Sequence, residues 1–224
     1  MFKNWINYEI IIKQVGDDMK GKFISFEGTE GSGKTSVIEK VKLHYENLGH
    51  KVLTTREPGG VNISEQIRSI LLDKKNIEMD ARTEALLFAA ARRQHLVEII
   101  IPALKKGYMV LCDRFVDSSL IYQGYARDIG IDKVYDINYF AIDEALPDLT
   151  IFVDVKPKVG LDRVFSTPNR EINRLDLEAL EFHKKIYQGY LSLVKKYDRI
   201  KKVNGETCLD DVVQETIKLI DKII

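Results

Sequence analysis

The residues of this 224-residue sequence that could do chemistry begin with a glycine-rich segment. Residues 28–35 read Gly-Thr-Glu-Gly-Ser-Gly-Lys-Thr and match the spacing G-x-x-x-x-G-K-[ST]. Backbone N–H groups of such a loop surround phosphate oxygens, and the N-terminus of the following helix adds positive partial charge. Lys34 is expected to reach the β- and γ-phosphates, and the Thr35 hydroxyl is expected to ligate Mg²⁺. The segment therefore predicts a nucleoside triphosphate site.

A phosphate loop by itself leaves a nucleotide switch, a motor, a transporter subunit and a kinase open. A guanine-reading switch would need an Asn-Lys-x-Asp element, which the sequence lacks. A motor ATPase would show paired acids after a strand, whereas the apolar run 108–112 is followed by Asp113 and Arg114. Asp113 is placed for Mg²⁺, through water, and Arg114 indicates a second anionic substrate nearby.

Further arginines follow the predicted strands. Arg56 and Arg114 lie within two residues of the ends of predicted strands, and Arg68 lies on the helix that follows Arg56. Ligands of an open parallel sheet bind at the carboxyl ends of its strands, so these cations are expected to gather there. Phosphoryl transfer needs aligned substrates and positive charge against their phosphates. Two phosphate-bearing substrates need more positive charge than one, because they repel each other. The pattern favours a kinase that acts on a phosphorylated acceptor.

Five ordered motifs narrow this prediction. They are Phe26-Glu27-Gly28, Arg56-Glu57-Pro58-Gly59-Gly60, Leu87-Phe88-Ala89-Ala90-Ala91-Arg92-Arg93, Asp113-Arg114-Phe115 and Ser118-Ser119-Leu120-Ile121-Tyr122-Gln123-Gly124. With these motifs the sequence resembles the thymidylate kinases, from Lys22 to the C-terminus. The resemblance implies Mg²⁺-dependent transfer of a phosphoryl group from ATP to dTMP, which gives dTDP for dTTP synthesis.

The resemblance also implies which residues contact dTMP. Phe88 would stack on thymine, Arg92 and Gln123 would bond its polar edge near Ser119, and Tyr122 would pack beneath the deoxyribose. Paired polar contacts reject a wrong base because a mismatch leaves buried groups unsatisfied. The implied dTMP-binding residues are Glu57, Pro58, Arg68, Phe88, Arg92, Arg114, Ser119, Tyr122 and Gln123.

The remaining roles concern ATP, the metal and the reaction. Arg68 and Arg114 would hold the dTMP phosphate, and no strong general base is needed because the acceptor is already ionised. The implied ATP-binding residues are Gly28, Thr29, Glu30, Gly31, Ser32, Gly33, Lys34, Thr35, Ser36, Arg163 and Arg170. The implied catalytic residues are Lys34, Arg114, Arg170, Glu30 and Asp113, and the metal-binding residues are Thr35 and Asp113.

Members of the family differ in where a catalytic arginine lies. The phosphate loop Thr29-Glu30-Gly31-Ser32 carries no arginine, so the sequence resembles the bacterial variant that supplies it from a mobile lid. The lid is expected at about residues 166–174, a short polar stretch. Arg163, Arg170 and Arg174 are the candidates for contact with the transferred phosphoryl group, and Arg170 is our first choice.

These side chains need a scaffold that brings strand ends together. Apolar runs alternate with helical patterns, which indicates parallel βαβ units and a sheet covered on both faces. We expect strands at 23–26, 52–55, 108–112, 149–153 and 200–203. We expect helices at 34–48, 63–72, 84–101, 118–126, 136–144, 159–165, 175–197 and 210–223, with a stop or kink near Pro102. The sequence thus predicts an α/β P-loop nucleotide-kinase fold, with a five-stranded parallel sheet flanked by helices and a short lid.

Composition excludes several classes of protein. Lys plus Arg and Asp plus Glu both total 34, which argues against a general nucleic-acid binder. No apolar run has the length of a membrane span. Cys112 and Cys208 are expected to be free thiols of a reducing cytoplasm, and the four histidines show no metal-ligand spacing. We expect a cytoplasmic protein with neither a nucleic-acid nor a membrane partner.

The sequence leaves alternatives open for the domain limits, for the oligomeric state and for the phosphoryl acceptor. We expect one kinase domain at 19–224 after an extension at 1–18, which either packs as an added helix or precedes a translation start at Met19. The helix at 84–101 is very apolar, and the resemblance implies a homodimer; burial of this helix within the monomer is the alternative. Two other functions are a kinase for another nucleoside monophosphate or a deoxynucleoside, and a P-loop nucleotide-dependent switch.

Overall fold

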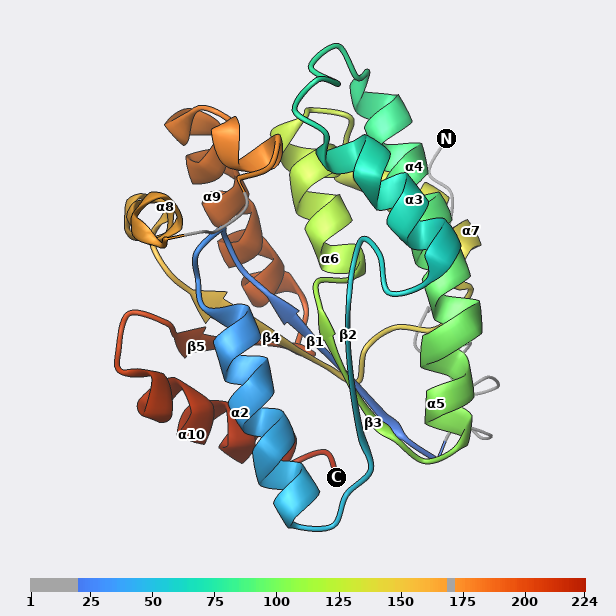
Figure 1. The fold of residues 1–224 in the computed structure, drawn as a ribbon, viewed down its shortest axis with the longest axis vertical. Helices are drawn as coiled ribbons and strands as arrows, with labels where there is room; N and C mark the ends of the chain where they lie inside the picture. Colours follow the sequence, from blue (N-terminus) through green and yellow to red (C-terminus); the bar gives the residue numbers. More distant parts are fainter. Residues whose placement is uncertain (1–19, 169–171) are drawn as a thin grey trace.

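The structure is a computed structural model in which residues 20–168 and 172–224 are described. The predicted extension at 1–18 and the predicted lid residue Arg170 lie outside the described residues. The strands form one five-stranded parallel sheet in the order β2-β3-β1-β4-β5 (Figure 1). They are β1 Lys22–Glu27, β2 Val52–Arg56, β3 Met109–Asp113, β4 Leu149–Asp154 and β5 Ile200–Asn204. The predicted α/β class with a five-stranded parallel sheet is confirmed.

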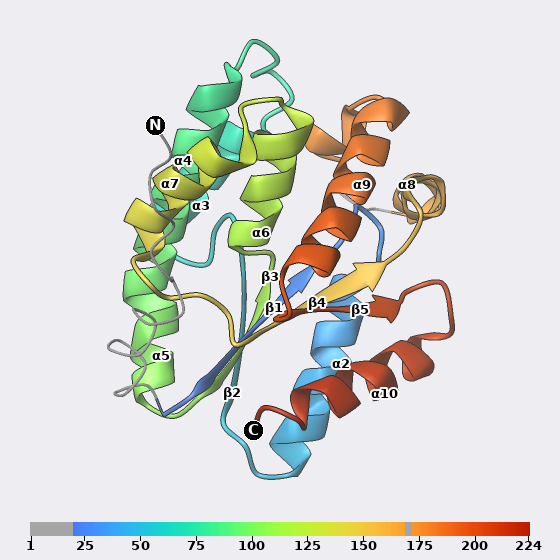
Figure 2. The ribbon, with the colours of Figure 1, turned by 180° about the vertical axis from the view of Figure 1, so that it is seen from behind.

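Helices cover both faces of the sheet. α2 and α10 lie against one face, and α4, α5, α7 and α9 lie on the opposite side (Figures 1 and 2). The α-helices are α2 Lys34–Asn47, α3 Asn62–Leu72, α4 Ala81–His95, α5 Ile101–Lys105, α6 Val116–Ser119, α7 Ile131–Ile142, α8 Pro157–Ser166, α9 Leu180–Lys196 and α10 Leu209–Ile220. The π-helical segments are η1 Leu96–Ile100 and η2 Leu120–Ala126, and η3 Leu175–Leu177 is a 3₁₀ turn. Within the described ranges, no helix has the length and apolar character needed to span a membrane.

Strand side chains divide between two hydrophobic cores. In β1, Phe23 belongs to the core that includes α5 and α9, whereas Ile24 and Phe26 belong to the core with α2 and α10. In β3, Val110 and Leu111 divide between the same two cores. Because both faces of the sheet are buried, these strands are apolar at consecutive positions rather than at alternate ones.

Two predicted helices begin at clearly different residues in the structure. The segment at 175–197 is not one helix, since η3 precedes α9 and α9 begins at Leu180. The Asn173 side chain accepts from the Leu175 N–H at 2.8 Å and closes that turn separately. The helix predicted at 136–144 begins earlier, at Ile131, directly after Gly130. Gly130 has a φ of 104°, which a side chain would disfavour, so the chain can turn sharply into the helix there.

The helix around Pro102 does not stop at the proline. α4 passes into the π-helical segment η1 and then into α5, which extends to Lys105. Proline has no N–H to donate, and the wider π-helical turn before it accommodates its ring. The predicted end at 101 is therefore too early.

The carboxyl ends of three adjacent strands bring the predicted site together. β1 ends at Glu27 before the phosphate loop, β2 ends at Arg56, and β3 ends at Asp113. Asp113 is in register with Phe26 of β1 and with Arg56 of β2. This edge is where open parallel sheets bind ligands.

Candidate active site

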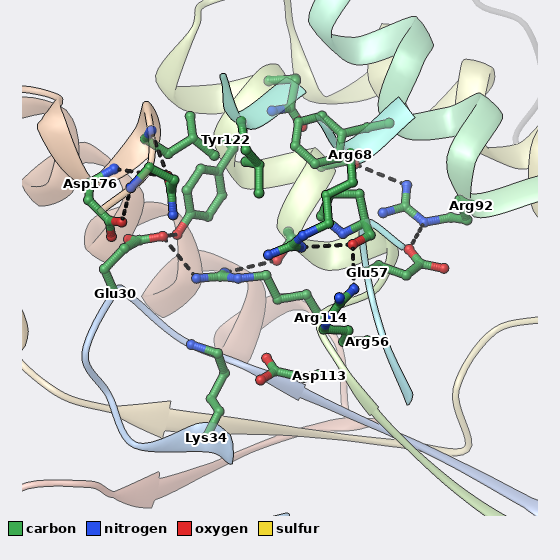
Figure 3. A pocket seen from close by; sticks show the side chains of 18 of the residues that line it. Glu30, Lys34, Arg56, Glu57, Arg68, Arg92, Asp113, Arg114, Tyr122 and Asp176 are labelled. Carbon is green, nitrogen blue, oxygen red and sulfur yellow. Dashed lines mark hydrogen bonds and ion pairs between the residues drawn. The ribbon is translucent and has the colours of Figure 1, made fainter. Parts of the chain in front are cut away.

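A cavity of about 320 Å³ lies at this edge of the sheet (Figure 3). Its volume is at the lower end of the range for small-molecule sites. The phosphate loop, the ends of β2 and β3, α3, α4, α6 and η2 all contribute to its lining. All nine predicted dTMP-binding residues line it, namely Glu57, Pro58, Arg68, Phe88, Arg92, Arg114, Ser119, Tyr122 and Gln123. The fold therefore gathers residues that span 67 positions of the sequence, from 57 to 123.

The phosphate loop holds Lys34 in a buried position. Its Nζ donates to the carbonyl oxygens of Gly28 and Thr29, at 3.2 and 3.1 Å, and to Ser32 Oγ at 3.1 Å. Burial and repulsion by Arg114 lower the pKa of Lys34 to about 8, although neighbouring carboxylates partly offset these effects. The acceptors that hydrogen-bond to the ammonium group are thus uncharged, and an anionic phosphate in direct contact would compensate its charge better.

Thr35 and Asp113 form the predicted metal-binding pair. The Thr35 hydroxyl donates to Asp113 Oδ2 at 3.0 Å. Both groups are hard oxygen donors, and Mg²⁺ is commonly held by one or two such groups together with phosphate oxygens and water. Within the described part of the chain, no cluster of three or more His, Cys, Asp or Glu residues could hold a metal ion. The donor set of Thr35 and Asp113 fits a magnesium ion that is shared with a bound nucleotide.

Arg114 lies between the phosphate loop and η2. Its Nη2 donates to Glu30 Oε1 at 2.9 Å, and its guanidinium carbon lies 5.1 Å from the centre of the Tyr122 ring. The Tyr122 hydroxyl donates to the same carboxylate, at 2.7 and 2.9 Å from its two oxygens. Burial by itself would raise the pKa of Glu30, but Arg114 and other neighbours, among them Lys34 and Tyr122, lower it to about 2. The Arg114 backbone has a φ of 68°, an unusual conformation for arginine and one found at functional sites.

Arg92 is fixed by four protein acceptors. Nε donates to Glu57 Oε2 at 2.7 Å, Nη1 to Ser119 Oγ at 3.0 Å and to Asn138, and Nη2 to the Phe115 carbonyl at 3.1 Å. The side chain is only 2% exposed. A guanidinium has five N–H donors, so these contacts leave one for a ligand.

The phosphate loop also packs closely against α8. A Cβ at Gly160 would lie 2.1 Å from the Glu30 carbonyl oxygen, and a Cβ at Gly31 would lie 2.0 Å from the Gly160 carbonyl oxygen. Arg163, in the last turn of α8, donates to the Gly31 carbonyl at 3.5 Å and to the Gly205 carbonyl at 3.3 Å. The predicted ATP-binding residue Arg163 therefore lies beside the phosphate loop rather than in the cavity lining.

This arrangement of a phosphate loop facing an arginine-rich cavity agrees with comparisons to known proteins. The Thymidylate kinase family model matches residues 26–216. The chain belongs to the thymidylate kinase family. It is 57% identical over 197 residues to a thymidylate kinase of Clostridium novyi (strain NT), covering 88% of this chain and 96% of that protein. It is 55% identical over 204 residues to a thymidylate kinase of Bacillus cytotoxicus, covering 91% and 98%.

A solved structure of the same family has the same fold. The crystal structure of thymidylate kinase from Ehrlichia chaffeensis superposes with a TM-score of 0.72 and 32% identity, and the match covers 90% of this chain and 98% of that chain. The predicted P-loop kinase fold is thereby confirmed, and so is the resemblance on which it rested.

Two buried carboxylates that contact lining residues of the cavity were missed by sequence reasoning in this thymidylate kinase family member. Glu84 is 1% exposed and accepts from Gln123, and Glu27 accepts from the Phe115 N–H at 2.8 Å and from the Ser118 hydroxyl at 2.6 Å. The spacing of Glu84, four residues before Phe88 and eight before Arg92, could have revealed the first, since such residues share a helix face. Glu27 ends β1 at the ligand-binding edge, which could have revealed the second.

Two histidines also have closer connections to the site than the sequence indicated. His95 is fully buried, with Nδ1 3.0 Å from Glu57 Oε1 and Nε2 2.6 Å from Thr55 Oγ1. His183 is 1% exposed, and its Nδ1 lies 3.4 Å from Glu30 Oε2. Each of the two histidines therefore faces a carboxylate of the site. No local spacing signals these contacts.

Arg174 does not face the phosphate loop. Its Nη2 pairs with Glu84, and its Nε donates to the Leu71 carbonyl at 3.1 Å. The side chain is 9% exposed. Of the three arginines considered for the transferred phosphoryl group, this one is therefore engaged elsewhere. Its neighbours on both sides in the sequence contribute to the cavity lining, namely Asn173, Leu175 and Asp176.

Proposed function

We propose that this chain transfers the γ-phosphoryl group of ATP to the phosphate of dTMP. The observation that carries the proposal is the single cavity in which the phosphate loop meets all nine predicted dTMP-binding residues. Membership of the thymidylate kinase family supports the same activity.

The phosphate ends of the two substrates would meet between the loop and Arg114. Lys34 would bind the β- and γ-phosphates, and Arg68 and Arg114 would hold the dTMP phosphate opposite them. Transfer of this kind needs alignment and positive charge more than covalent help from the protein. Thr35 and Asp113 would hold Mg²⁺, which supplies charge neutralisation for the phosphates when bound. The acceptor oxygen is already ionised, so no side chain has to remove a proton.

The base end of dTMP would occupy the part of the cavity lined by α4 and η2. Phe88 is half-buried and packs against the main core, which suits a ring that stacks on thymine. The remaining N–H of Arg92 would donate to the base carbonyl, with Ser119 beside it. Tyr122 would pack beneath the deoxyribose, where Glu30 holds its hydroxyl. A 2′-hydroxyl would be crowded there, which favours deoxynucleotides.

Arg170 would supply the catalytic charge from the lid at about residues 166–174. Two observations on the other candidates support this choice. Arg174 forms an ion pair with Glu84, and Arg163 donates to the backbone carbonyls of Gly31 and Gly205. Closure of the lid over ATP would exclude water and limit wasteful hydrolysis.

The assembly, domain limits and location are proposed on separate grounds. Exposed apolar residues gather on the packed pair α4 and α7, where Leu86 is 55% exposed and Phe140 is 88% exposed. Such a patch fits a homodimer interface, which light scattering of the wild type and of Phe140→Glu would test. Residues 19–224 form one kinase domain in this proposal. A cytoplasmic location is supported by the free thiols of Cys112 and Cys208.

A coupled assay of ADP release tests the activity. ATP and Mg²⁺ are held constant while dTMP, dUMP, dCMP, dGMP and AMP are offered in turn. We expect strong preference for dTMP, with dUMP a weak second. Turnover with another monophosphate instead would preserve the fold and overturn the base contacts, and ATP hydrolysis indifferent to every acceptor would favour a nucleotide-dependent switch. Lys34→Ala is expected to lose turnover while it keeps dTMP binding.

A further inference from the structure

A buried carboxylate on α4 lies directly behind the residues that would contact the base. Glu84, Phe88 and Arg92 follow one another at four-residue intervals and therefore share one face of the helix. Phe88 and Arg92 line the cavity, whereas Glu84 does not. Its side chain is 1% exposed and lies against Gln123, which does line the cavity.

The two oxygens of Glu84 have different partners. Oε1 accepts from Gln123 Nε2 at 2.8 Å. Oε2 accepts from Arg174 and lies 3.5 Å from Arg127 Nη2. The two guanidinium groups compensate the negative charge of the carboxylate, which then offers acceptors only. The arginines occupy one oxygen, and the other faces the glutamine.

This arrangement removes an ambiguity that an amide side chain normally has. Either end of a glutamine amide can face a ligand unless its neighbours decide. Glu84 can only accept, so the nitrogen of Gln123 must face it and the carbonyl oxygen is left for the cavity. Among the described residues, the hydrogen bonds of the Gln123 amide engage its nitrogen alone.

The two sides of the base site then have opposite hydrogen-bonding character. The Gln123 carbonyl offers an acceptor, and the remaining N–H of Arg92 offers a donor. Thymine and uracil present N3–H as a donor and O4 as an acceptor, whereas cytosine presents an N3 acceptor and an N4 amino donor. The pair complements thymine and opposes cytosine at both positions.

We propose that Glu84 is a specificity-determining positioning residue, which fixes the Gln123 amide with its carbonyl toward the base and thereby excludes cytosine. The proposal rests on the proposed dTMP kinase activity. A purely structural ion pair would account for Arg174 and Arg127, but it would not require the second oxygen to face the cavity-lining amide. The carboxylate acts through Gln123 and does not itself contact substrate.

Glu84→Gln tests this role, because it is expected to change kcat/KM for dTMP and for dCMP in opposite directions. The arginines need an acceptor at the Oε2 position, so the new amide nitrogen takes the Oε1 position and faces Gln123. The Gln123 amide then has to rotate, so that its carbonyl faces that nitrogen, away from the cavity, and its NH₂ group faces the base. We expect kcat/KM for dTMP to fall about tenfold and kcat/KM for dCMP to rise, so that the dTMP:dCMP ratio falls by about two orders of magnitude.

Glu178→Gln is the matched control. Glu178 pairs with Arg127 in the same charge cluster and is 25% exposed, and among the described residues no hydrogen bond or ion pair joins it to Gln123. We expect this variant to keep the wild-type dTMP:dCMP ratio. A fall in kcat/KM for both nucleotides alike in Glu84→Gln, with the ratio unchanged, would overturn the proposal and assign Glu84 a structural role only.

Two further measurements separate the possible failures. In a Gln123→Ala background, Glu84→Gln is expected to leave the ratio unchanged, because the effect passes through the glutamine; an equal effect there would overturn the proposal. In the wild-type protein, the hydrogens of the Gln123 side-chain NH₂ are expected to exchange slowly with solvent, both with and without dTMP. Exchange as fast as in a free glutamine would also overturn the proposal.

If the wild type phosphorylates dTMP and rejects dCMP, failure of these tests refutes only the role of Glu84. If the wild type does not phosphorylate dTMP, the proposed function fails first.

Discussion

The buried Lys34 predicts a pH dependence of ATP binding that an ordinary lysine would not produce. Burial and the nearby Arg114 lower the pKa of Lys34 to about 8, from an ordinary value of 10.5. The ammonium form is the one that binds phosphate, so ATP has to bind a protein whose Lys34 is protonated. Above the folded-state pKa, that protonation costs part of the binding free energy.

The magnitude follows from the pKa. Because the protonated fraction falls from about nine-tenths at pH 7 to about one-tenth at pH 9, the Kd for ATP is expected to rise about tenfold between them. With a pKa of 10.5, the Kd would stay nearly constant over that interval. Isothermal titration calorimetry in two buffers of different ionisation enthalpy measures both the Kd and the proton uptake. The same shift means that the contribution of Lys34 to stability rises with pH from about 8 to 10.5, since the unfolded chain binds the proton more tightly there.

Two variants decide whether Lys34 is responsible. Lys34→Met is expected to weaken ATP binding at pH 7 and to remove the slope. Lys40→Met is the matched control, because Lys40 lies on the same helix, is 46% exposed and pairs with Asp210. A wild-type Kd that stays constant up to pH 9, or a slope that survives in Lys34→Met, would refute the reasoning.

Two further predictions concern stability and loop packing. Glu57→Gln is expected to lower the free energy of unfolding by about 3 kcal/mol, because the buried Arg92 loses its one carboxylate partner among the described residues. Denaturant unfolding measures this, with Glu65→Gln at the exposed Arg56 pair as a control that should cost about 1 kcal/mol or less. Gly160→Ala is expected to displace the phosphate loop, because the new Cβ would lie 2.1 Å from a loop carbonyl. Its KM for ATP should rise at least tenfold while dTMP binding persists, and an unchanged KM would contradict the close packing.

The strands and the edge of the sheet at which ligands bind could be predicted from the sequence because the signals are local, whereas the spatial order of the strands came from the structure. An apolar run followed by Gly28 and Lys34 defines a strand, a phosphate loop and a helix within a short stretch of chain. The same is true of Asp113, which ends β3, and of Arg114, which follows it. Parallel topology then requires these strand ends to meet at one edge, so the cavity and most of its lining follow.

The residues at which helices begin and end were harder to predict, because they depend on interactions that the spacing of apolar residues does not reveal. The start of α9 at Leu180 follows a separate turn that the Asn173 side chain closes. The helix around Pro102 continues because a π-helical turn precedes it. Periodicity of apolar residues gives the presence of a helix, but caps and altered turns decide where it ends.

The sequence by itself determined the class of the fold, the phosphate loop, and the residues whose types suit dTMP and ATP. Only the tertiary structure decided how those side chains are held. Glu57 meets Arg92 and His95, and Glu84 meets Gln123 and Arg174, across separations of 35 to 90 residues. A buried charge is tolerated only where partners from other elements surround it, and those partners are adjacent in space without being adjacent in sequence. The residue types that do chemistry are therefore visible in the chain, whereas the buried groups that orient them become visible only once the chain has folded.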